Sequence, residues 1–515
     1  MTAAGATIQT TPLERMLITA CVMMATIMQA LDTTIANVAL PYMQGSLSAT
    51  LDQVSWVLTS YIVAAAIMTA PTGWLALRFG RKRLLIVCAA GFTVASMLCG
   101  VAQSIEQMVL FRLLQGVFGA ALVPLSQAVM MDIFPPAQRT SAMAIWGIGV
   151  MLGPILGPAL GGYLTDALSW RWVFFVNLPF GIATVVGLVL FMRETDPQTE
   201  RTFDWFGFGM LSLAIGSFQL MLDRGQQLGW FTSNEIIIEG LLAAVGAYYF
   251  LAHSFTAKKP FIPLEMFADR NFSVSVVFMF LVGILILATL ALITPYVQNV
   301  MGYPIIAAGY ILGVRGIGTM AAMMLVGRIA NRVDPRYILT TGLALSTLSL
   351  YQLISLSPNT SSGSLFVTSV IQGFGLGLVF VPLSSIAFAT LAPHLRTEGA
   401  GVWTLIRNLG SSIGVSVVIA QLTGTASLMH ARLGEALTPF NAGLQFQIGG
   451  PLDPTTNAGL AGLEATLSQQ ASLIAFSNDF KLMMLVSLCA FPLLVLLRGP
   501  QRSGAPAPSA AHAAD

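Results

Sequence analysis

The stretch of sequence from residue 139 to residue 162 reads RTSAMAIWGIGVMLGPILGPALGG, and a related stretch at residues 396–415 reads RTEGAGVWTLIRNLGSSIGV. The two stretches share an arginine–threonine pair, a tryptophan and two glycines: Arg139, Thr140, Trp146, Gly153 and Gly157 in the first, and Arg396, Thr397, Trp403, Gly410 and Gly414 in the second. Two shorter motifs recur after nearly the same interval: PYMQ at 41–44 as PYVQ at 295–298, and QG at 115–116 as QG at 372–373. A nearly constant interval across three regions predicts that the chain is built from two related halves.

The composition is that of an integral membrane protein. The chain has 515 residues, of which 56% are hydrophobic and only 9% are charged, whereas a soluble domain carries about 25% charged residues. Its mean hydropathy is +0.79. A net charge of +2 is too small to suggest a nucleic-acid partner. The four cysteines lie in apolar stretches without metal-type spacing, so we expect no disulfide, no metal and no other cofactor.

Apolar stretches long enough to cross a membrane recur along the whole chain. A spanning helix needs about 20 mostly apolar residues, and the sequence predicts fourteen, near residues 16–39, 54–77, 84–103, 107–131, 141–165, 173–192, 204–222, 236–256, 273–298, 304–327, 337–356, 364–388, 398–422 and 480–498. The first six form an N-terminal half, residues 16–193, and the last six a C-terminal half, residues 272–498. Two inserted helices lie between them at residues 203–256. We therefore predict an all-α integral membrane fold of two six-helix halves plus two inserted helices, with both halves in the same orientation.

The Lys and Arg residues orient the predicted spans. If the N-terminal segment, residues 1–15, is cytoplasmic, most of the 24 Lys and Arg residues fall in cytoplasmic segments, as the positive-inside rule requires. An even number of spans then places the C-terminus on the same side. The outer side carries one long connection, residues 423–479, and the tail at residues 499–515 is rich in Ala, Pro and Ser, so we expect it to be disordered.

One acidic residue, Asp32, lies inside the first predicted span, within the stretch LDTTIANVALP at residues 31–41. An ionisable side chain at membrane depth costs about 3 kcal/mol or more and is a candidate functional residue for that reason. Burial in a medium of low dielectric constant disfavours the charged form of a carboxyl group, so such a group can gain and lose protons near neutral pH. We therefore predict that Asp32 binds the proton of a proton-coupled carrier.

Arg112, in the fourth predicted span, lies at a depth similar to that of Asp32. At about 1.5 Å rise per residue, Asp32 lies roughly 10 Å and Arg112 roughly 8 Å from the outer ends of their spans. We expect the guanidinium to lie near the carboxylate and to favour its charged form, so that a helix shift would allow protonation. The alternative is a static ion pair that only holds two helices together. The second-half counterparts, Ile286 or Thr289 and Ser369, are apolar or small, so the pair is no repeated scaffold feature.

The fifth predicted span carries glycine at every fourth position: Gly149, Gly153, Gly157 and Gly161. These glycines form one slowly drifting stripe on a helix, and small residues let a second helix approach its backbone closely. Pro154 and Pro158 remove internal hydrogen bonds and permit bending. We expect this span to form the moving contact between the halves; the alternative is a tight helix crossing with no further role.

This stripe resembles the antiporter motif of drug exporters in the major facilitator superfamily, and further segments carry the same likeness. GWLALRFGRKR at residues 73–83 resembles the signature between spans two and three of that superfamily, and LFRLLQG at 110–116 resembles its span-four arginine motif. The stretch at 31–41 resembles the span-one motif of its fourteen-helix drug:proton antiporters. SWRW at 169–172 and NLP at 177–179 are also typical of that group. The likeness is to EmrB-type exporters in particular.

The resemblance implies a major facilitator fold and proton-driven efflux of hydrophobic drugs or toxic lipophilic compounds across the bacterial inner membrane. It also implies a periplasmic adaptor protein and an outer-membrane channel as partners. The resemblance implies a conformational role for the glycine stripe and its two prolines. It implies the same role for five further residues: Gly73, Arg78, Gly80, Arg81 and Asp132. One departure is Leu77, where the family signature has an aspartate that helps to latch the cytoplasmic side. Arg78 can still pair with Asp132 at the end of span four.

Four polar residues within the spans are expected to face the substrate cavity: Asn37, Gln115, Arg315 and Arg407. For the two arginines, the alternative is contact with backbone carbonyl groups. The expected ligands are lipophilic small molecules and protons, with membrane lipid around the bundle.

Other functions remain open from the sequence. One is a proton-coupled uptake symporter of the same fold, and another is a sensor that binds lipophiles without transporting them. A membrane enzyme is not expected, because no nucleophile–base pair, metal-ligand cluster or phosphate-binding loop is apparent. The outer connection, residues 423–479, is predicted to dock the adaptor or, alternatively, to gate the cavity mouth.

Overall fold

In the computed structural model of the chain, the described residues are 11–135, 138–194, 202–258, 260–303, 305–330, 332–355, 357, 360–435, 437 and 452–497. Every regular element in these ranges is a helix. The predicted tail 499–515, residues 1–10 of the predicted N-terminal segment and residues 438–451 of the predicted outer connection lie outside them.

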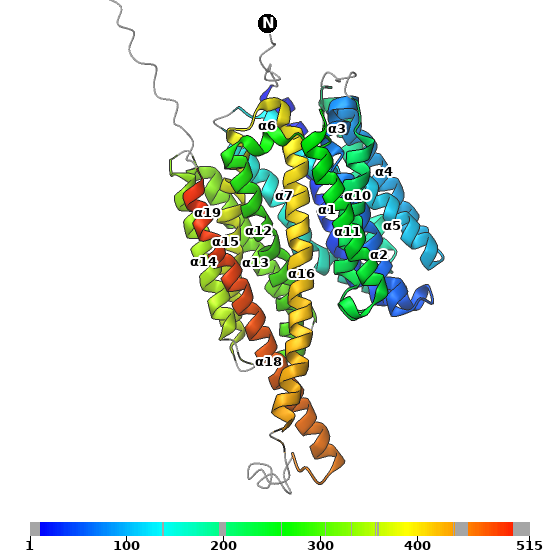
Figure 1. Ribbon diagram of the computed structural model, residues 1–515, viewed down its shortest axis with the longest axis vertical. Helices are drawn as coiled ribbons and strands as arrows, with labels where there is room; N and C mark the ends of the chain where they lie inside the picture. The colour runs from blue at the N-terminus through cyan, green and yellow to red at the C-terminus, as the bar shows by residue number, and fades with distance from the viewer. Residues whose placement is uncertain are drawn as a thin grey trace, which may run out of the picture.

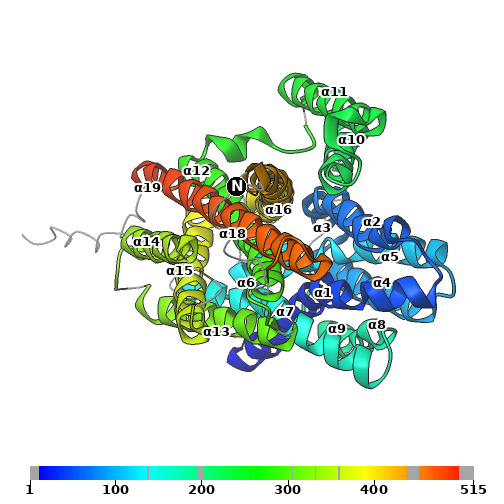
Figure 2. The same cartoon turned by 90° about the horizontal axis from the view of Figure 1, so that it is seen from below.

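The first part of the chain forms an N-terminal half and two further helices. The half consists of α1 (Pro12–Ser46), α2 (Leu51–Thr69), α3 (Thr72–Phe79), α4 (Arg81–Val101), α5 (Ile105–Gly119), α6 (Leu122–Ile133), α7 (Arg139–Ala167), α8 (Trp172–Phe175) and α9 (Asn177–Phe191). The inserted pair is α10 (Trp205–Arg224) and α11 (Asn234–Thr256). Both lie on the outside of the bundle (Figure 2), where α10 packs against α2 and α16.

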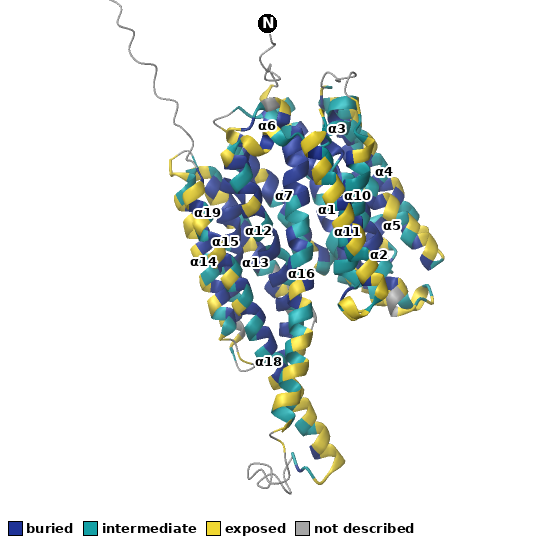
Figure 3. Ribbon diagram, viewed as in Figure 1, coloured by how far each residue is buried: buried dark blue, intermediate teal, exposed yellow. Residues whose placement is uncertain are grey.

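The C-terminal half follows the inserted pair. It consists of α12 (Arg270–Pro295) with the π-helical turn η4 (Tyr296–Val300), α13 (Ile305–Ile329), α14 (Pro335–Ile354), α15 (Ser362–Ala389), α16 (Arg396–Glu435), α18 (Asn457–Cys489) and α19 (Phe491–Leu496). α16 and α18 continue well beyond the bundle as a helical pair (Figure 1), and the projecting part is largely exposed (Figure 3). Most of the described part of the predicted outer connection is therefore helix.

Twelve helices in the described part of the chain are long and apolar enough to cross a membrane, or up to thirteen if α2 and α3, bent by 57° at their junction, form one span. α5 and α6 count as one span, as do α8 and α9. α13 is 25 residues long and occupies the position of the remaining predicted span. The count of fourteen spans therefore remains a prediction, whereas the all-α, multi-pass membrane fold is confirmed.

The two halves repeat the same helix contacts. α7 packs on α1 and α5 packs on α2 and α4, just as α16 packs on α12 and α15 packs on α13 and α14. The recurring glycines lie at these crossings. A Cβ atom added to Gly153 would lie 2.2 Å from the carbonyl carbon of Ala30, and one added to Gly410 would lie 2.2 Å from the carbonyl oxygen of Phe280. The repeated glycines therefore correspond to two equivalent backbone-to-backbone contacts, one in each half.

The second repeated motif marks another such crossing. A Cβ atom on Gly116 of α5 would lie 2.5 Å from the carbonyl oxygen of Tyr61 in α2. Its counterpart on Gly373 of α15 would lie 1.9 Å from the carbonyl oxygen of Arg315 in α13. Neither position has room for a side chain, because the atom that it would meet belongs to the backbone.

The glycine stripe of α7 faces α1 of its own half. Cβ atoms on the four glycines would meet, in chain order, Met23, Ala30, Thr34 and Ile35, all of α1. Other residues of α7 reach the C-terminal half: the Trp146 ring stacks on Phe380 at 6.0 Å, and Ile155 packs against Gly316. The span as a whole contacts the C-terminal half by packing on α13, while its glycine stripe faces α1. Its role as the moving contact stays a prediction. Glycine is needed where two backbones touch, and the stripe serves the close contact of α7 with α1 within one half.

The halves are joined at the end of the bundle where α1 begins, at the top of Figure 1. There Arg81 Nη2 donates to Thr397 Oγ1 (2.6 Å), and Ser141 Oγ donates to the carbonyl oxygen of Gly327 (2.7 Å). Each bond links an N-terminal-half helix with a C-terminal-half helix. This end of the bundle is therefore closed.

Gly153→Ala should separate α1 from α7, because its new methyl group would overlap the Ala30 backbone. We expect a loss of about 1–3 kcal/mol of stability, the usual cost of overpacking, seen as a lower thermal unfolding midpoint in detergent micelles. Gly162→Ala is the matched control, since a Cβ atom on Gly162 meets nothing within 4 Å. Equal midpoints for the two variants would contradict the close contact.

Candidate functional site

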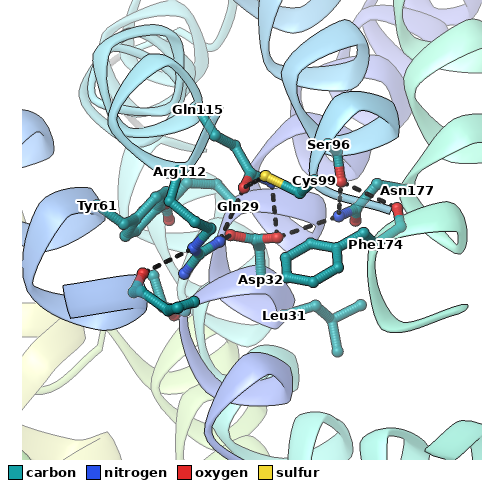
Figure 4. A network of polar contacts seen from close by, with 12 residues as sticks. Gln29, Leu31, Asp32, Tyr61, Ser96, Cys99, Arg112, Gln115, Phe174 and Asn177 are labelled. Carbon is teal, nitrogen blue, oxygen red and sulfur yellow. Dashed lines mark hydrogen bonds and ion pairs between the residues drawn. The ribbon is translucent and has the colours of Figure 1, made fainter. Parts of the chain in front are cut away.

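Asp32 of α1 and Arg112 of α5 form an ion pair inside the N-terminal half. Arg112 Nη1 donates to Asp32 Oδ2 at 2.7 Å (Figure 4). Both residues have no exposed surface. The contact expected from their similar depths is present, and its role in proton coupling stays a prediction.

Two side-chain amides complete the shell around the carboxylate. Gln115 Nε2 donates to Asp32 Oδ1 at 2.8 Å, and Asn177 Nδ2, at the start of α9, donates to the same oxygen at 3.2 Å. Gln115 Oε1 in turn accepts from Arg112 Nη1 at 2.8 Å. A guanidinium only donates, so this bond fixes the orientation of the Gln115 amide. Asp32, Arg112 and Gln115 thus form a closed triangle with Asn177 at its edge (Figure 4).

The neighbouring helices hold the guanidinium in place. Arg112 Nε donates to the carbonyl oxygen of Val57 at 3.0 Å. Its guanidinium carbon lies 4.4 Å from the centre of the Tyr61 ring and 5.6 Å from that of Phe174. Cation–π contacts of this kind strengthen when water is excluded. The cation is therefore held by contacts that do not involve Asp32.

The arrangement fits an ionised Asp32. All three groups that reach the carboxylate are donors, and a protonated carboxyl group would need an acceptor for its own hydrogen. The oxygen of Gln115 that could accept it is already held by Arg112. Protonation of Asp32 would require Asp32 to move away from Arg112 or the amides to rotate, and either change would break side-chain hydrogen bonds that link α1 to α5 and α9.

The structure separates the four predicted cavity residues. Gln115 belongs to the Asp32 network, whereas Asn37 is an exposed residue of α1 outside that network. Arg315 lines a cavity between the halves. Arg407 is not among the described residues that line this cavity, and its Nη2 donates to Asn408 Oδ1 at 3.3 Å.

The predicted conformational residues lie at the closed end, with one change of partner. Asp132 pairs with Arg81, not with Arg78. Arg78 lies on α3, whereas Arg81 opens α4 after the break at Gly80, whose φ of +90° favours glycine. That break turns the Arg81 side chain toward Asp132 and Thr397, so the proposed pairing of Arg78 with Asp132 is wrong.

Gly73 lies at a second contact between the halves at this end. A Cβ atom on Gly73 would lie 2.6 Å from the Cα atom of Glu398 in α16. Leu77 leaves α3 without the acid of the family signature, and the close approach of α3 to the first turn of α16 is retained without it.

Sequence reasoning missed several members of the Asp32 network. Asn177 was noted only as part of a typical segment, and Ser96 of α4 and Tyr61 of α2 were not singled out. Ser96 Oγ accepts from Asn177 Nδ2 at 3.0 Å and donates to the carbonyl oxygen of Phe174 at 2.9 Å. The one signal for Asn177 is an amide at the start of an apolar span, where a buried polar group needs a partner.

Two similar helical halves with a cavity between them, and a buried charged pair within one half, are typical of a secondary-transporter architecture. The sequence profile of the Major Facilitator Superfamily matches residues 22–415, and the chain belongs to that superfamily. It is 36% identical to the multidrug export protein EmrB of Escherichia coli K12 over 442 residues, covering 85% of this chain and 86% of that protein. It is 34% identical to the fatty acid resistance protein FarB of Neisseria gonorrhoeae over 484 residues, covering 93% and 96%.

A solved structure shares the fold at low sequence identity. The human organic anion transporter MFSD10 (TETRAN) superposes with a TM-score of 0.57 at 14% identity, covering 93% of this chain and all of that one. The predicted major facilitator fold and EmrB-type relationship are therefore confirmed.

Removing one partner of the buried pair should destabilise the protein more than removing both. Arg112→Gln leaves an uncompensated buried carboxylate, at a cost of about 3–5 kcal/mol. Adding Asp32→Asn to that variant should recover much of the loss, since no buried charge remains. Thermal unfolding of the wild type, both single variants and the double variant in one detergent measures the coupling. Strictly additive losses would show that the two charges do not depend on each other.

Proposed function

We propose that the chain is a proton-coupled antiporter that exports lipophilic drugs across the bacterial inner membrane, with both termini in the cytoplasm. The observation that carries this proposal is the sealed Asp32–Arg112 pair, because an intramembrane carboxylate with a breakable ion pair suits proton exchange. The relationship to EmrB, a multidrug export protein, supports drug efflux as the transported activity. We infer transport, not catalysis, from membership in a transporter superfamily.

We infer a place in the transport cycle from the closed end of the bundle. With the N-terminus cytoplasmic, the bonds from Arg81 to Thr397 and from Ser141 to Gly327 close the cytoplasmic side. Asp32 is then ionised in the conformation that is closed to the cytoplasm. Proton uptake from outside breaks its bond to Arg112 and so removes a side-chain link between α1 and α5. The halves then reopen toward the cytoplasm, where drug binding and proton release restore the pair.

Arg81 and Asp132 act in this cycle as a latch. Their ion pair joins the start of α4 to the end of α6, and the Arg81 guanidinium also reaches Thr397 of the other half. Opening the cytoplasmic side must break the bond to Thr397. Arg81 therefore connects the rigid N-terminal half to the surface that moves.

We also propose that the projecting ends of α16 and α18 dock a periplasmic adaptor protein, which links the chain to an outer-membrane channel. The pair extends beyond the bundle (Figure 1), on the outer side in the proposed orientation. It carries exposed apolar residues, with Leu428 49% and Leu460 51% exposed. Exposed leucines on a projecting helical pair suit contact with another protein.

Asp32→Asn should abolish export driven by a pH gradient while leaving drug binding intact, because an amide does not carry a proton. Efflux of a fluorescent lipophile from loaded vesicles measures export at matched expression. Asp166→Asn is the control: Asp166 is an exposed acid of the same half that accepts a hydrogen bond from the Tyr42 hydroxyl at 2.9 Å. We expect this control to export like the wild type.

Three other results would contradict the antiporter proposal. Gradient-driven accumulation by the wild type would indicate an uptake symporter. Binding without movement in either direction would indicate a sensor. Equal gradient-driven export by the wild type and Asp32→Asn would place the proton pathway elsewhere.

Leu428→Glu combined with Leu460→Glu should weaken adaptor docking, because charges would replace the apolar contact surface. We expect at least a tenfold loss of adaptor recovered by cross-linking in intact cells, about the effect of 1.4 kcal/mol, together with lower drug resistance. Gln470→Glu, at an exposed polar position of α18, is the control for added charge. Unchanged cross-linking and resistance in the double variant would refute the docking surface.

A further inference from the structure

Arg315 lies on the wall of a cavity between the two halves. The cavity is small in this conformation, with a volume of about 50 Å³, and it is partly open to solvent. Met151, Pro154 and Ile155 of α7 form one wall, and residues of α12, α13 and α15 form the other. All four helices contribute residues from near their middles, so the cavity lies deep in the bundle, where transporters of this architecture bind their ligands.

The cavity walls are apolar apart from one charge. Among the described lining residues, Arg315 alone is charged, and the hydroxyl of Thr319 already donates to the carbonyl oxygen of Arg315 at 3.1 Å. Ile286, Leu290 and Phe380 are typical of the other side chains. The cavity therefore presents a single guanidinium to otherwise lipophilic surroundings.

The Arg315 guanidinium has no acidic partner among the described residues. Its Nη2 donates to the carbonyl oxygen of Ile286 at 3.3 Å, and no ion pair to Asp or Glu joins it. Arg315 is only 7% exposed. Arg112, the other deeply buried arginine of a membrane helix discussed above, is neutralised by Asp32. A buried cation without a counter-ion is costly, and a carboxylate on a guanidinium relieves that cost with two parallel hydrogen bonds.

We propose that Arg315 is the counter-ion for the head group of a lipophilic monoanion, whose apolar body lies against α7, α12 and α15. This inference rests on the proposed export function and names a substrate class for it. A carboxylate binds best because it neutralises the guanidinium. A neutral analogue keeps only the apolar contacts, and a cationic analogue is repelled. Affinity for compounds of one shape therefore falls in the order anion, neutral compound, cation.

The test uses three pyrene probes that share one apolar body: 1-pyrenebutanoate, 1-pyrenebutanamide and 1-pyrenebutyltrimethylammonium. Their dissociation constants are measured by fluorescence anisotropy with the purified full-length chain in nanodiscs at about pH 7, where a carboxylic acid is ionised. We expect the wild type to bind the anion at least about tenfold more tightly than the amide, as one charge-assisted hydrogen-bonded pair provides. The cation should bind more weakly than the amide.

Three variants assign that preference to Arg315. Arg315→Gln should bind anion and amide equally while keeping the wild-type affinity for the amide, which also shows that the variant is folded. Arg315→Lys should keep most of the preference, because the charge remains. Arg407→Gln removes a second guanidinium of the same half that does not line the cavity, and its preference should match the wild type. This variant therefore distinguishes direct contact between Arg315 and the head group from the electrostatic field of the other charges in the C-terminal half.

The outcomes distinguish this inference from the transport proposal. Equal binding of all three probes by the wild type, or an unchanged anion preference in Arg315→Gln, overturns the counter-ion site. Loss of the preference in Arg407→Gln but not in Arg315→Gln overturns it as well. Gradient-driven export of the anionic and the neutral probe by the wild type is measured separately. Absence of export of both probes would overturn the antiporter proposal without affecting the binding comparison.

Discussion

The ion pair between Asp32 and Arg112 is the constraint on which the N-terminal half depends. A carboxylate sealed among apolar helices is tolerable only while donors surround it, and here one guanidinium and two amides do so. Those donors come from α5 and α9, so the side-chain bonds of one α1 residue join three helices. Any movement of α1 relative to α5 or α9 therefore alters the set of donors that surrounds this carboxylate.

α7 places this charged pair one helix away from the cavity. Gly153 lies against Ala30 of α1, two residues before Asp32, and the carbonyl oxygen of Gly153 accepts from Thr34 Oγ1 at 3.0 Å. The next residue, Pro154, lines the cavity on the other face of the same helix. Because the two backbones touch without intervening side chains, a displacement of α7 would be passed directly to the segment that carries Asp32. The missing backbone donor of Pro154 softens α7 at this point.

Much of the fold and part of the site follow from the sequence in physical terms. Hydropathy and the internal repeat predict two helical halves, because spans need long apolar runs and equivalent backbone contacts need glycine. Depth along the spans predicts the proximity of Asp32 and Arg112. Depth does not give the rotation of a helix about its axis, so the partner of the glycine stripe and the place of Asn177 in the network were missed. Nor does it give the chain direction after a break, which is why Asp132 pairs with Arg81.

The most direct test of the central claim is proton release by the purified protein. A lipophilic drug is added to the chain in weakly buffered detergent solution, and a pH-indicator dye records the change for the wild type and for Asp32→Asn. If drug binding restores the pair between Asp32 and Arg112, the wild type releases protons on drug addition and the variant, which binds the drug equally, releases none. Equal release from both proteins would show that Asp32 does not carry the coupled proton.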